Sequence, residues 1–352
     1  MIRVGLIGFG LAGQAFHAPM IRSIEGMELA CVLERHTDNA KKRYPNVRVA
    51  RSLDELLSDS TINLCAIATP NDTHFSYARA CLEAGRHVVV DKPLTPTMAE
   101  AEELVRLAEV RGLILTVYQD RRFDGIFHTV RKLLSSGVLG TIAEYETRFD
   151  RFRPEPKPNA WREKANFPAA GVLWDLGPHV IDGALVLFGE PESICATAFC
   201  QRATSEIDDA FDIQMKYRGM HANLRARIIA YAPGPHLVIH GTKGSFVKFG
   251  MDPQEPLLRV PNPPDGLNWG ENWGMEPEDR WGTLSLVNEE PRKIPTDRGD
   301  YRGFYANVRD AIEKKATLEV SPQHALRVMR AILLSHKSSR EGRLVRWDEA
   351  VA

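Results

Sequence analysis

Three groups of residues in this sequence have the types and spacing needed for chemistry. The first is Gly8-Phe9-Gly10-Leu11-Ala12-Gly13, which follows the apolar run 2–7. The second is Asp91-Lys92-Pro93, and the third is the pair Asp175 and His179, four residues apart. Glycine turns accommodate pyrophosphates, an ammonium group stabilises a developing alkoxide, and an imidazole transfers protons. The sequence therefore offers one nucleotide-binding pattern and two candidate sites of electrostatic or acid–base catalysis.

The glycine pattern gains specificity from its surroundings. Glycines alone also form ordinary turns, but this pattern follows an apolar strand and precedes a helix-like segment, 14–24. Glu34 ends the next apolar stretch roughly 20 residues on, where an acidic side chain binds ribose hydroxyls. We therefore expect dinucleotide binding. Glu34 favours NAD because it repels a 2′-phosphate, whereas Arg35 and His36 follow directly and an arginine there accepts that phosphate. NADP stays open.

Each catalytic candidate also has a structural explanation. A solvated surface charge is the default for a lysine, but Lys92 follows the strand-like run 87–90. A helix places Asp175 and His179 on one face, while the alternative is a helix cap followed by a half-buried histidine. Pro178 suits a first helical turn, so we expect the helix to start close by, and its positive end biases the histidine toward the neutral base.

A further turn, Thr69-Pro70-Asn71-Asp72-Thr73-His74, follows the apolar strand 62–68. Asn71 or Asp72 caps the next helix in the structural interpretation, and Asn71 meets the nicotinamide half of a cofactor in the functional one. Both interpretations can hold at once.

The elements that must position these groups alternate between strands and helices over the first third of the chain. Beyond Glu34 we expect a short helix at 54–57 capped by Ser52, then the strand 62–68. The helix 74–84, the strand 87–90, the helix 97–111 capped by Thr95 or Thr97, and the strand 113–117 follow. Such repeats predict a doubly wound parallel sheet of the Rossmann type. Ligands bind at the carboxyl ends of such strands, here Gly8, Glu34, 69–71, 91–93 and 118–119, which should line one crevice.

Near residue 120 the pattern changes. A helix is expected at 124–135, a strand at 141–149, a polar loop at 151–168 and a helix at 172–188. Strand-like runs follow at 193–200, 211–217, 221–228, 237–240 and 245–249, then a long surface loop at 251–282 and helices at 301–314 and 322–340. We therefore predict a Rossmann domain at 1–120 and an α+β domain at 121–352 with a mostly antiparallel sheet.

Bulk properties exclude several classes of protein. The 45 basic and 46 acidic residues nearly balance, so neither nucleic acid nor an acidic membrane is indicated. Five scattered cysteines favour small buried hydrophobes in a reducing compartment, and no metal-ligand set is visible. A strand starts at residue 2 and no apolar run approaches a membrane span, so we expect a cytoplasmic protein without a signal peptide.

Taken together, these motifs resemble the Gfo/Idh/MocA oxidoreductases. The glycine turn, the 69–74 segment, the lysine tripeptide and the Asp175–His179 pair carry the resemblance along the whole chain. Further stretches, 16–19, 71–75, 121–124, 150–154 and 252–255, are similar to the bacterial scyllo-inositol dehydrogenase-like branch. One departure is Asp91, where the family usually has glutamate, and it keeps the charge.

The resemblance implies NAD or NADP, with NAD slightly favoured, and a sugar or cyclitol substrate. It implies catalytic roles for Lys92, for His179 as acid/base, and for Asp175 as the residue that orients substrate hydroxyls. Cofactor contacts are expected from Gly8, Phe9, Gly10, Leu11, Ala12, Gly13, Glu34, Arg35, Thr69, Pro70, Asn71, His74, Asp91, Lys92, Gln119, Trp161 and Arg162. Substrate contacts are expected from Arg122, Arg153, Arg162, Asp175 and His179, although a surface ion pair explains each arginine equally well.

The expected reaction is hydride transfer between a carbinol carbon of a cyclic polyol and nicotinamide. His179 takes the hydroxyl proton, and Lys92 stabilises the alkoxide. Two alternatives remain: a dinucleotide-binding regulator, which should lack the lysine or the histidine, and a cofactor-dependent glycosidase. Relatives are usually dimers or tetramers, and the open face of the second sheet suggests a self-association surface.

Overall fold

The computed structural model describes residues 1–157, 160–260 and 263–351, and the chain divides into two compact units. Unit 1 comprises Met1–Phe123, Gln254–Trp273 and Asp300–Leu326. Unit 2 comprises Asp124–Pro253, Gly274–Gly299 and Arg327–Ala352. Each unit is built on its own sheet.

Unit 1 contains a six-stranded sheet in the order β3-β2-β1-β4-β5-β6, and all its strand pairs are parallel. The strands are β1 (Ile2–Ile7), β2 (Met27–Leu33), β3 (Arg48–Ala50), β4 (Leu64–Ile67), β5 (His87–Asp91) and β6 (Leu115–Tyr118). Every residue of β4 is buried, as expected for a strand with helices on both faces. The predicted doubly wound sheet is confirmed.

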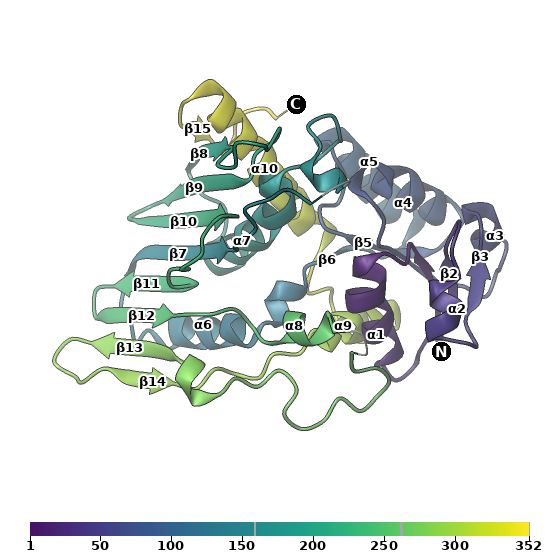
Figure 1. The fold of residues 1–352 in the computed structure, drawn as a ribbon, viewed down its shortest axis with the longest axis horizontal. Coiled ribbons are helices and arrows are strands. Elements are labelled where there is room, and N and C mark those ends of the chain that lie inside the picture. Colours follow the sequence, from purple (N-terminus) through teal and green to yellow (C-terminus); the bar gives the residue numbers. More distant parts are fainter. Residues whose placement is uncertain (158–159, 261–262, 352) are drawn as a thin grey trace. The chain divides into compact units, whose positions relative to one another are not determined.

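Capping residues set the ends of the helices in unit 1. Thr97 and Glu100 form a reciprocal capping box at the start of α5, and Gly112 ends that helix with φ 63°. Ser52 caps α3 by accepting from the Glu55 N–H at 3.1 Å. Figure 1 shows α4 and α5 side by side. The helices are α1 (Ala18–Arg22), α2 (Asn39–Arg43), α3 (Leu53–Leu57), α4 (His74–Glu83), α5 (Met98–Arg111), α8 (Gln254–Leu258) and α9 (Arg302–Ile312), with short turns η1 (Gly13–His17), η2 (Asn71–Thr73) and η3 (Asp120–Phe123).

The segment after the glycine turn departs from a plain α-helix. The helix expected over 14–24 is a π-helical turn, η1, continued by α1. π-Helical turns are rare and occur frequently at functional sites. This one brings His17, whose side chain is fully buried, into the interior of the unit.

Unit 2 contains a nine-stranded sheet in the order β14-β13-β12-β11-β7-β10-β9-β8-β15, visible as successive arrows in Figure 1. Its strands are β7 (Ile142–Asp150), β8 (Ser193–Phe199), β9 (Ala210–Tyr217), β10 (Met220–Arg227), β11 (Leu237–Gly241), β12 (Gly244–Lys248), β13 (Gly282–Leu286), β14 (Arg292–Ile294) and β15 (Val345–Arg346). All pairs are antiparallel except β7 with β10. The predicted α+β class is confirmed.

The helices of unit 2 are α6 (Gly125–Ser136), α7 (Val172–Phe188) and most of α10 (Pro322–Glu341), with short turns η4 (Trp161–Glu163) and η5 (Glu278–Arg280). The division between the units falls inside α10. Helix α7 has the predicted bounds, but Pro178 lies in its interior and not in its first turn. The expectation that the helix begins close to Pro178 is therefore wrong: the cap at Gly171 sets the start more than one turn earlier.

Three other expectations need correction. Helix α2 and strands β3, β13, β14 and β15 were not predicted, because each has five residues or fewer. The supposed surface loop 251–282 contains α8, and its Gln254, Trp269 and Trp273 are buried. Cys31, Cys65 and Cys81 are buried as expected, whereas Cys195 and Cys200 are exposed, Cys195 on the outer face of β8.

No helix among the residues with assigned structure has the length and apolarity required to cross a bilayer.

Candidate active site

The glycine turn joins β1 to η1 at the carboxyl edge of the parallel sheet. Gly8 has φ 97°, and a Cβ there would lie 2.7 Å from the carbonyl oxygen of Ala68. At Gly13 a Cβ would lie 2.3 Å from the Gly8 carbonyl oxygen, whereas at Gly10 it would meet nothing within 4 Å. Gly8 and Gly13 thus permit close packing, and Gly10 leaves the open approach that a pyrophosphate needs. Of the other residues in the turn, Phe9 is buried and Leu11 is exposed, while Ala12 is the residue before η1.

Glu34 lies directly after β2, where the sequence predicts a ribose-binding residue. Its side chain is turned toward the start of α2: the carboxylate accepts the main-chain N–H groups of Asn39 at 3.1 Å and Ala40 at 2.9 Å. The hydroxyl of Thr37 also donates to it, and Glu34 is only 6% exposed. Arg35, the next residue, is exposed. The glutamate therefore acts as a cap for α2, while the cation beside it faces solvent.

The loops after β4 and β5 are joined by one histidine. The ring of the fully buried His74 lies 3.0 Å (Nε2) from the Thr69 carbonyl oxygen and 2.8 Å (Nδ1) from that of Pro93. Asn71 is buried in η2, directly after Pro70. His74 thus holds the predicted cofactor turn at a fixed distance from the lysine tripeptide.

Lys92 follows the last residue of β5 and is half-buried. Its main-chain N–H donates to the carboxylate of the buried Asp91 at 2.8 Å. This hydrogen bond fixes the backbone at the point where the lysine side chain leaves the sheet.

Gln119 lies directly after β6 and is 2% exposed. Its Oε1 is buried and has no hydrogen-bond partner in the described part of the chain. A buried unpartnered acceptor at the carboxyl edge of a parallel sheet fits an amide group of a bound cofactor. This atom and the open approach at Gly10 make the edge suitable for a nicotinamide dinucleotide.

Arg122 lies in η3 and is 5% exposed. Its guanidinium donates to the main-chain carbonyl of Glu319, also in unit 1. Arg153 follows β7 in unit 2, where its main-chain N–H donates to the Ile228 carbonyl oxygen at 2.7 Å. The substrate contacts expected of both arginines stay predictions.

In unit 2 the structure brings together the predicted residues of η4 and α7. Nε of Arg162 lies 3.2 Å from Oδ1 of Asp175, and its guanidinium carbon lies 4.1 Å from the centre of the Trp161 ring. His179, one turn beyond Asp175, stacks on Phe149 of β7 with ring centres 5.8 Å apart. Asp175 lies in the first turn of α7, where its negative charge is favourable.

Sequence reasoning missed three titratable residues near these groups. Asp120 is buried directly after Gln119, and burial raises its pKa to about 6, with opposing contributions from Arg121 and Lys92. Nδ1 of His17 lies 2.6 Å from the Tyr305 hydroxyl, and burial lowers the pKa of His17 to about 4. Asp208 contacts the start of α7. Only His17 lay in a stretch that carried the family resemblance, and no local signal distinguished the other two.

No group of three or more His, Cys, Asp or Glu residues in the described ranges is arranged to hold a metal ion.

Comparisons with known proteins cover both units. A family model described as an oxidoreductase family with an NAD-binding Rossmann fold matches residues 2–119, and the GFO/IDH/MocA C-terminal domain matches residues 127–247. Similar proteins include scyllo-inositol 2-dehydrogenase (NADP(+)) IolW of Bacillus subtilis, 35% identical over 98% of this chain and 95% of that protein. The uncharacterized oxidoreductase YdgJ of Escherichia coli is 40% identical over 96% of each. The crystal structure of an oxidoreductase from Bacillus cereus has a TM-score of 0.88 at 28% identity and covers 100% of both chains.

These matches, together with the glycine turn at the carboxyl edge of the parallel sheet, define a nicotinamide-dependent oxidoreductase. The chain belongs to the Gfo/Idh/MocA family, in its inositol dehydrogenase-like branch. It is a dehydrogenase that acts on CH–OH groups with NAD or NADP.

Proposed function

We propose that this dehydrogenase oxidises a ring carbinol of a cyclic polyol, with scyllo-inositol as the first candidate. The observation that carries the proposal is the full-length similarity to IolW, whose name specifies that substrate. The presence of both Lys92 and His179 supports catalysis and weighs against a regulator that has lost its reactive groups.

In the proposed reaction a bound nicotinamide supplies the hydride acceptor. His179 takes the hydroxyl proton as the carbinol C–H bond breaks, and Lys92 stabilises the oxygen as its negative charge grows. The hydride leaves with the bonding electron pair, a ketone forms, and the imidazolium releases the proton to solvent. Asp175 holds a neighbouring ring hydroxyl, and its ion pair with Arg162 keeps that carboxylate in place.

The test is a panel of inositols, glucose, xylose and anhydro-sugars with each oxidised cofactor, followed by the absorbance of reduced nicotinamide. Turnover of scyllo-inositol well above that of the aldoses supports the proposal. Activity confined to aldoses contradicts the cyclitol assignment. Cleavage of a glycoside without net reduction of the cofactor would instead indicate the glycosidase alternative.

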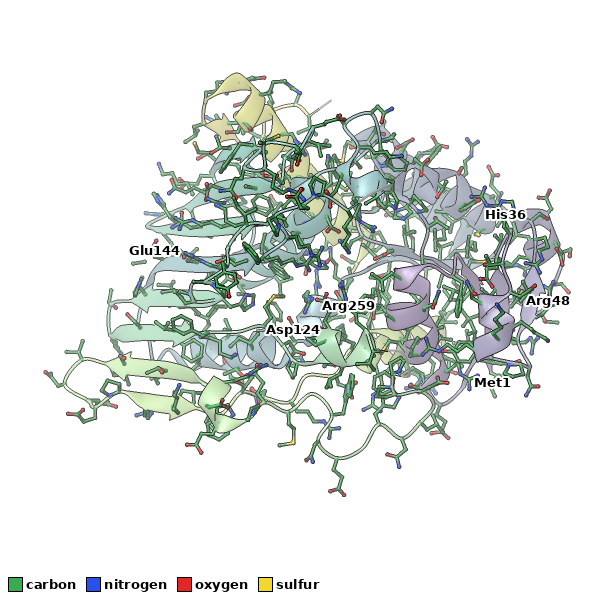
Figure 2. The ribbon with its side chains drawn as sticks, viewed as in Figure 1. Met1, His36, Arg48, Asp124, Glu144 and Arg259 are labelled. Carbon is green, nitrogen blue, oxygen red and sulfur yellow. The ribbon has the colours of Figure 1, made fainter. Side chains whose placement is uncertain are left out.

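We also propose that NADP is the better cofactor, although Glu34 by itself favours NAD. The capping bonds to Asn39, Ala40 and Thr37 hold the carboxylate in the α2 turn and away from a role at the ribose. The exposed Arg35 and His36 follow it, and His36 is marked on the surface in Figure 2. Arg51 orders this turn by donating to the Glu34 carbonyl at 2.7 Å and pairing with Asp38.

Arg35→Ala tests the cofactor proposal, with Lys42→Ala as a matched control on the adjacent helix. A charge-assisted hydrogen bond contributes about 1.5–3 kcal/mol, so kcat/KM for NADP should fall roughly tenfold or more in Arg35→Ala. The value for NAD should change little, and Lys42→Ala should resemble the wild type. Equal losses with both cofactors, or a wild type that prefers NAD, would refute the proposal.

Finally, we propose self-association through the polar face of the nine-stranded sheet. Side chains that alternate with the buried residues of β7, β9 and β10 form a hydrogen-bonded layer on this face. Asn223 donates to Glu144 at 2.6 Å and accepts from Gln214 at 3.2 Å, and Glu144 is labelled near the end of the strands in Figure 2. Such a prearranged polar surface suits a homodimer or homotetramer.

A further inference from the structure

The start of helix α7 is capped by a residue that is remote in the sequence. The first N–H groups of a helix lack partners within the helix, and the residue at the cap position, Gly171, has no side chain to offer. Asp208 supplies what is missing. Its Oδ2 accepts the Leu173 N–H at 2.8 Å, and its main-chain carbonyl oxygen accepts the Val172 N–H at 2.9 Å. The two partners are 35 residues apart for the side-chain bond.

Gly171 is required for this contact. Its φ is 93°, and a Cβ there would lie 2.2 Å from Oδ1 of Asp208. Its N–H donates to the carbonyl oxygen of Arg162 at 2.8 Å. The glycine thus joins η4 to the helix start while leaving space for the aspartate.

The loop that carries Asp208 is itself held in place by the next residue. The carboxylate of Asp209, 1% exposed, accepts the Gln201 N–H at 2.6 Å and the Arg202 Nε–H at 2.9 Å. Arg202 also pairs with Glu163 of η4 at 3.2 Å. These contacts tie the loop 200–209 to both η4 and α7, so Asp208 cannot move independently of either.

The two segments that this loop holds carry the candidate chemistry of unit 2. Asp175 is in the first turn of α7 and His179 in the next, while η4 carries Arg162, the ion-pair partner of Asp175. We propose that Asp208 is a positioning residue, which sets the orientation of Asp175 and His179 by fixing the first turn of α7 against η4. This inference rests on the proposed catalytic role of α7.

Burial raises the pKa of the Asp208 carboxyl to about 6, although the nearby N–H groups of Leu173 and Val172 lower it. The negatively charged Asp209 adds to the increase. A carboxylate with a raised pKa opposes folding at neutral pH, where it is ionised. An asparagine keeps one acceptor oxygen for the Leu173 N–H and avoids this cost. The capping contact therefore requires an acceptor oxygen at this position and not the negative charge.

The test compares Asp208→Ala, Asp208→Asn and the control Glu206→Ala, an exposed position on the same loop. Steady-state rates with NADP+ and scyllo-inositol are measured beside hydrogen exchange by mass spectrometry. In Asp208→Ala we expect faster exchange in peptides covering 171–179 and a kcat lower by about tenfold, since small misplacements of catalytic groups are costly. The KM for NADP+ should stay within about twofold. Asp208→Asn should recover most of the kcat and melt at or above the wild-type temperature at pH 7.5.

Exchange at 171–179 that is unchanged in Asp208→Ala would overturn the inference, as would a wild-type kcat in that variant. A kcat that falls only in proportion to the melting temperature would indicate a purely structural role and also overturn it. If the wild type turns over no cyclitol, the proposed function fails. The exchange comparison then still decides whether Asp208 fixes the start of α7.

Discussion

The two sheets of this protein position functional groups by different means. In unit 1 every residue of β4 and all but the first of β5 are buried, so side chains along the strands are enclosed and only the strand ends are available. In unit 2 buried and half-exposed residues alternate along β7 and β10, and the candidate groups come from a helix and a short turn beside the sheet. The strand ends therefore determine where the candidate groups of unit 1 lie, whereas those of unit 2 depend on the start of α7.

The largest expected effect comes from removing one reactive group from each unit. Lys92→Ala and His179→Ala should each lower kcat by roughly a hundredfold or more, because an electrostatic donor or a general acid–base is lost. Dinucleotide binding, measured by isothermal titration, should persist in both. The exposed Lys42→Ala and His221→Ala serve as matched controls. Near-normal turnover in either variant would show that its unit supplies some other group.

The free energy of unfolding should depend less on acidic pH in the variant His17→Asn than in the wild type. Burial lowers the pKa of His17 to about 4, so the unfolded chain binds the extra proton first as the pH falls. The stability contributed by neutral His17 is fully present above about pH 6.5 and is lost toward pH 4, roughly 3 kcal/mol in all.

Denaturant unfolding at several pH values checks this prediction. His17→Asn should lose less stability than the wild type between pH 7 and pH 4.5, with the exposed His36→Asn as control. Burial also lowers the pKa of His336 in unit 2 to about 4, so part of the acid sensitivity will remain. If the free energy of unfolding depends on pH in the same way in His17→Asn and in the wild type, His17 is not a source of the acid sensitivity.

Gly8 and Gly10 of the glycine turn should have different roles, Gly8 in packing and Gly10 in the approach of the ligand. Gly8→Ala should lower stability by about 1–3 kcal/mol, because it forces a side chain into positive φ and against the Ala68 carbonyl. Gly10→Ala should melt like the wild type, since its Cβ meets no atom, yet bind NADP about tenfold more weakly. Thermal melts and titration calorimetry distinguish the two. Unchanged affinity in Gly10→Ala would mean that the cofactor does not approach this backbone.

The smallest effect on stability is expected on the polar face of the nine-stranded sheet. Asn223→Arg should change the free energy of unfolding of a protomer by only about 0.5 kcal/mol, as is usual for surface substitutions. It should nevertheless lower the mass measured by light scattering, because the bulky cation disrupts the proposed contact. Arg218→Glu, on the turn between β9 and β10, is the control. An unaltered mass would show that this face is not the self-association surface.

Local patterns were sufficient for much of the fold. The apolar runs, the capping box at Thr97 and the left-handed Gly112 are signals within a few residues of the structures they specify. Strands β1, β2, β4, β5 and β6 and helices α3, α4, α5 and α9 were predicted with small boundary errors, whereas α2, β3 and α8 were not predicted. In β13 the alternation of leucine with Thr and Ser covers only five residues, and β14 has three residues, so neither gives a periodic pattern long enough to predict a strand. The π-helical turn after Gly13 also has the composition of an ordinary helix.

The candidate site was less predictable where partners are distant in the sequence. The glycines and Lys92 stand out because strand ends can be found from periodicity. The capping role of Glu34 depends on where the α2 turn folds, and the cap of α7 depends on Asp208, a loop residue in a polar run. Such contacts exist only after the chain has folded, so no spacing rule reveals them.

Unit 1 consists of three separate segments of the chain, so it cannot be completed early in translation. Unit 1 is complete only when residues 254–273 and 300–326 have been added to residues 1–123. Tyr305, the partner of His17, and Trp273, which donates to Gln254, both belong to these late segments. A nascent chain that has emerged from the ribosome only as far as residue 123 therefore lacks part of this unit's interior. A fragment cut at that residue should not fold into the native unit, and the two units should mature together at the end of translation.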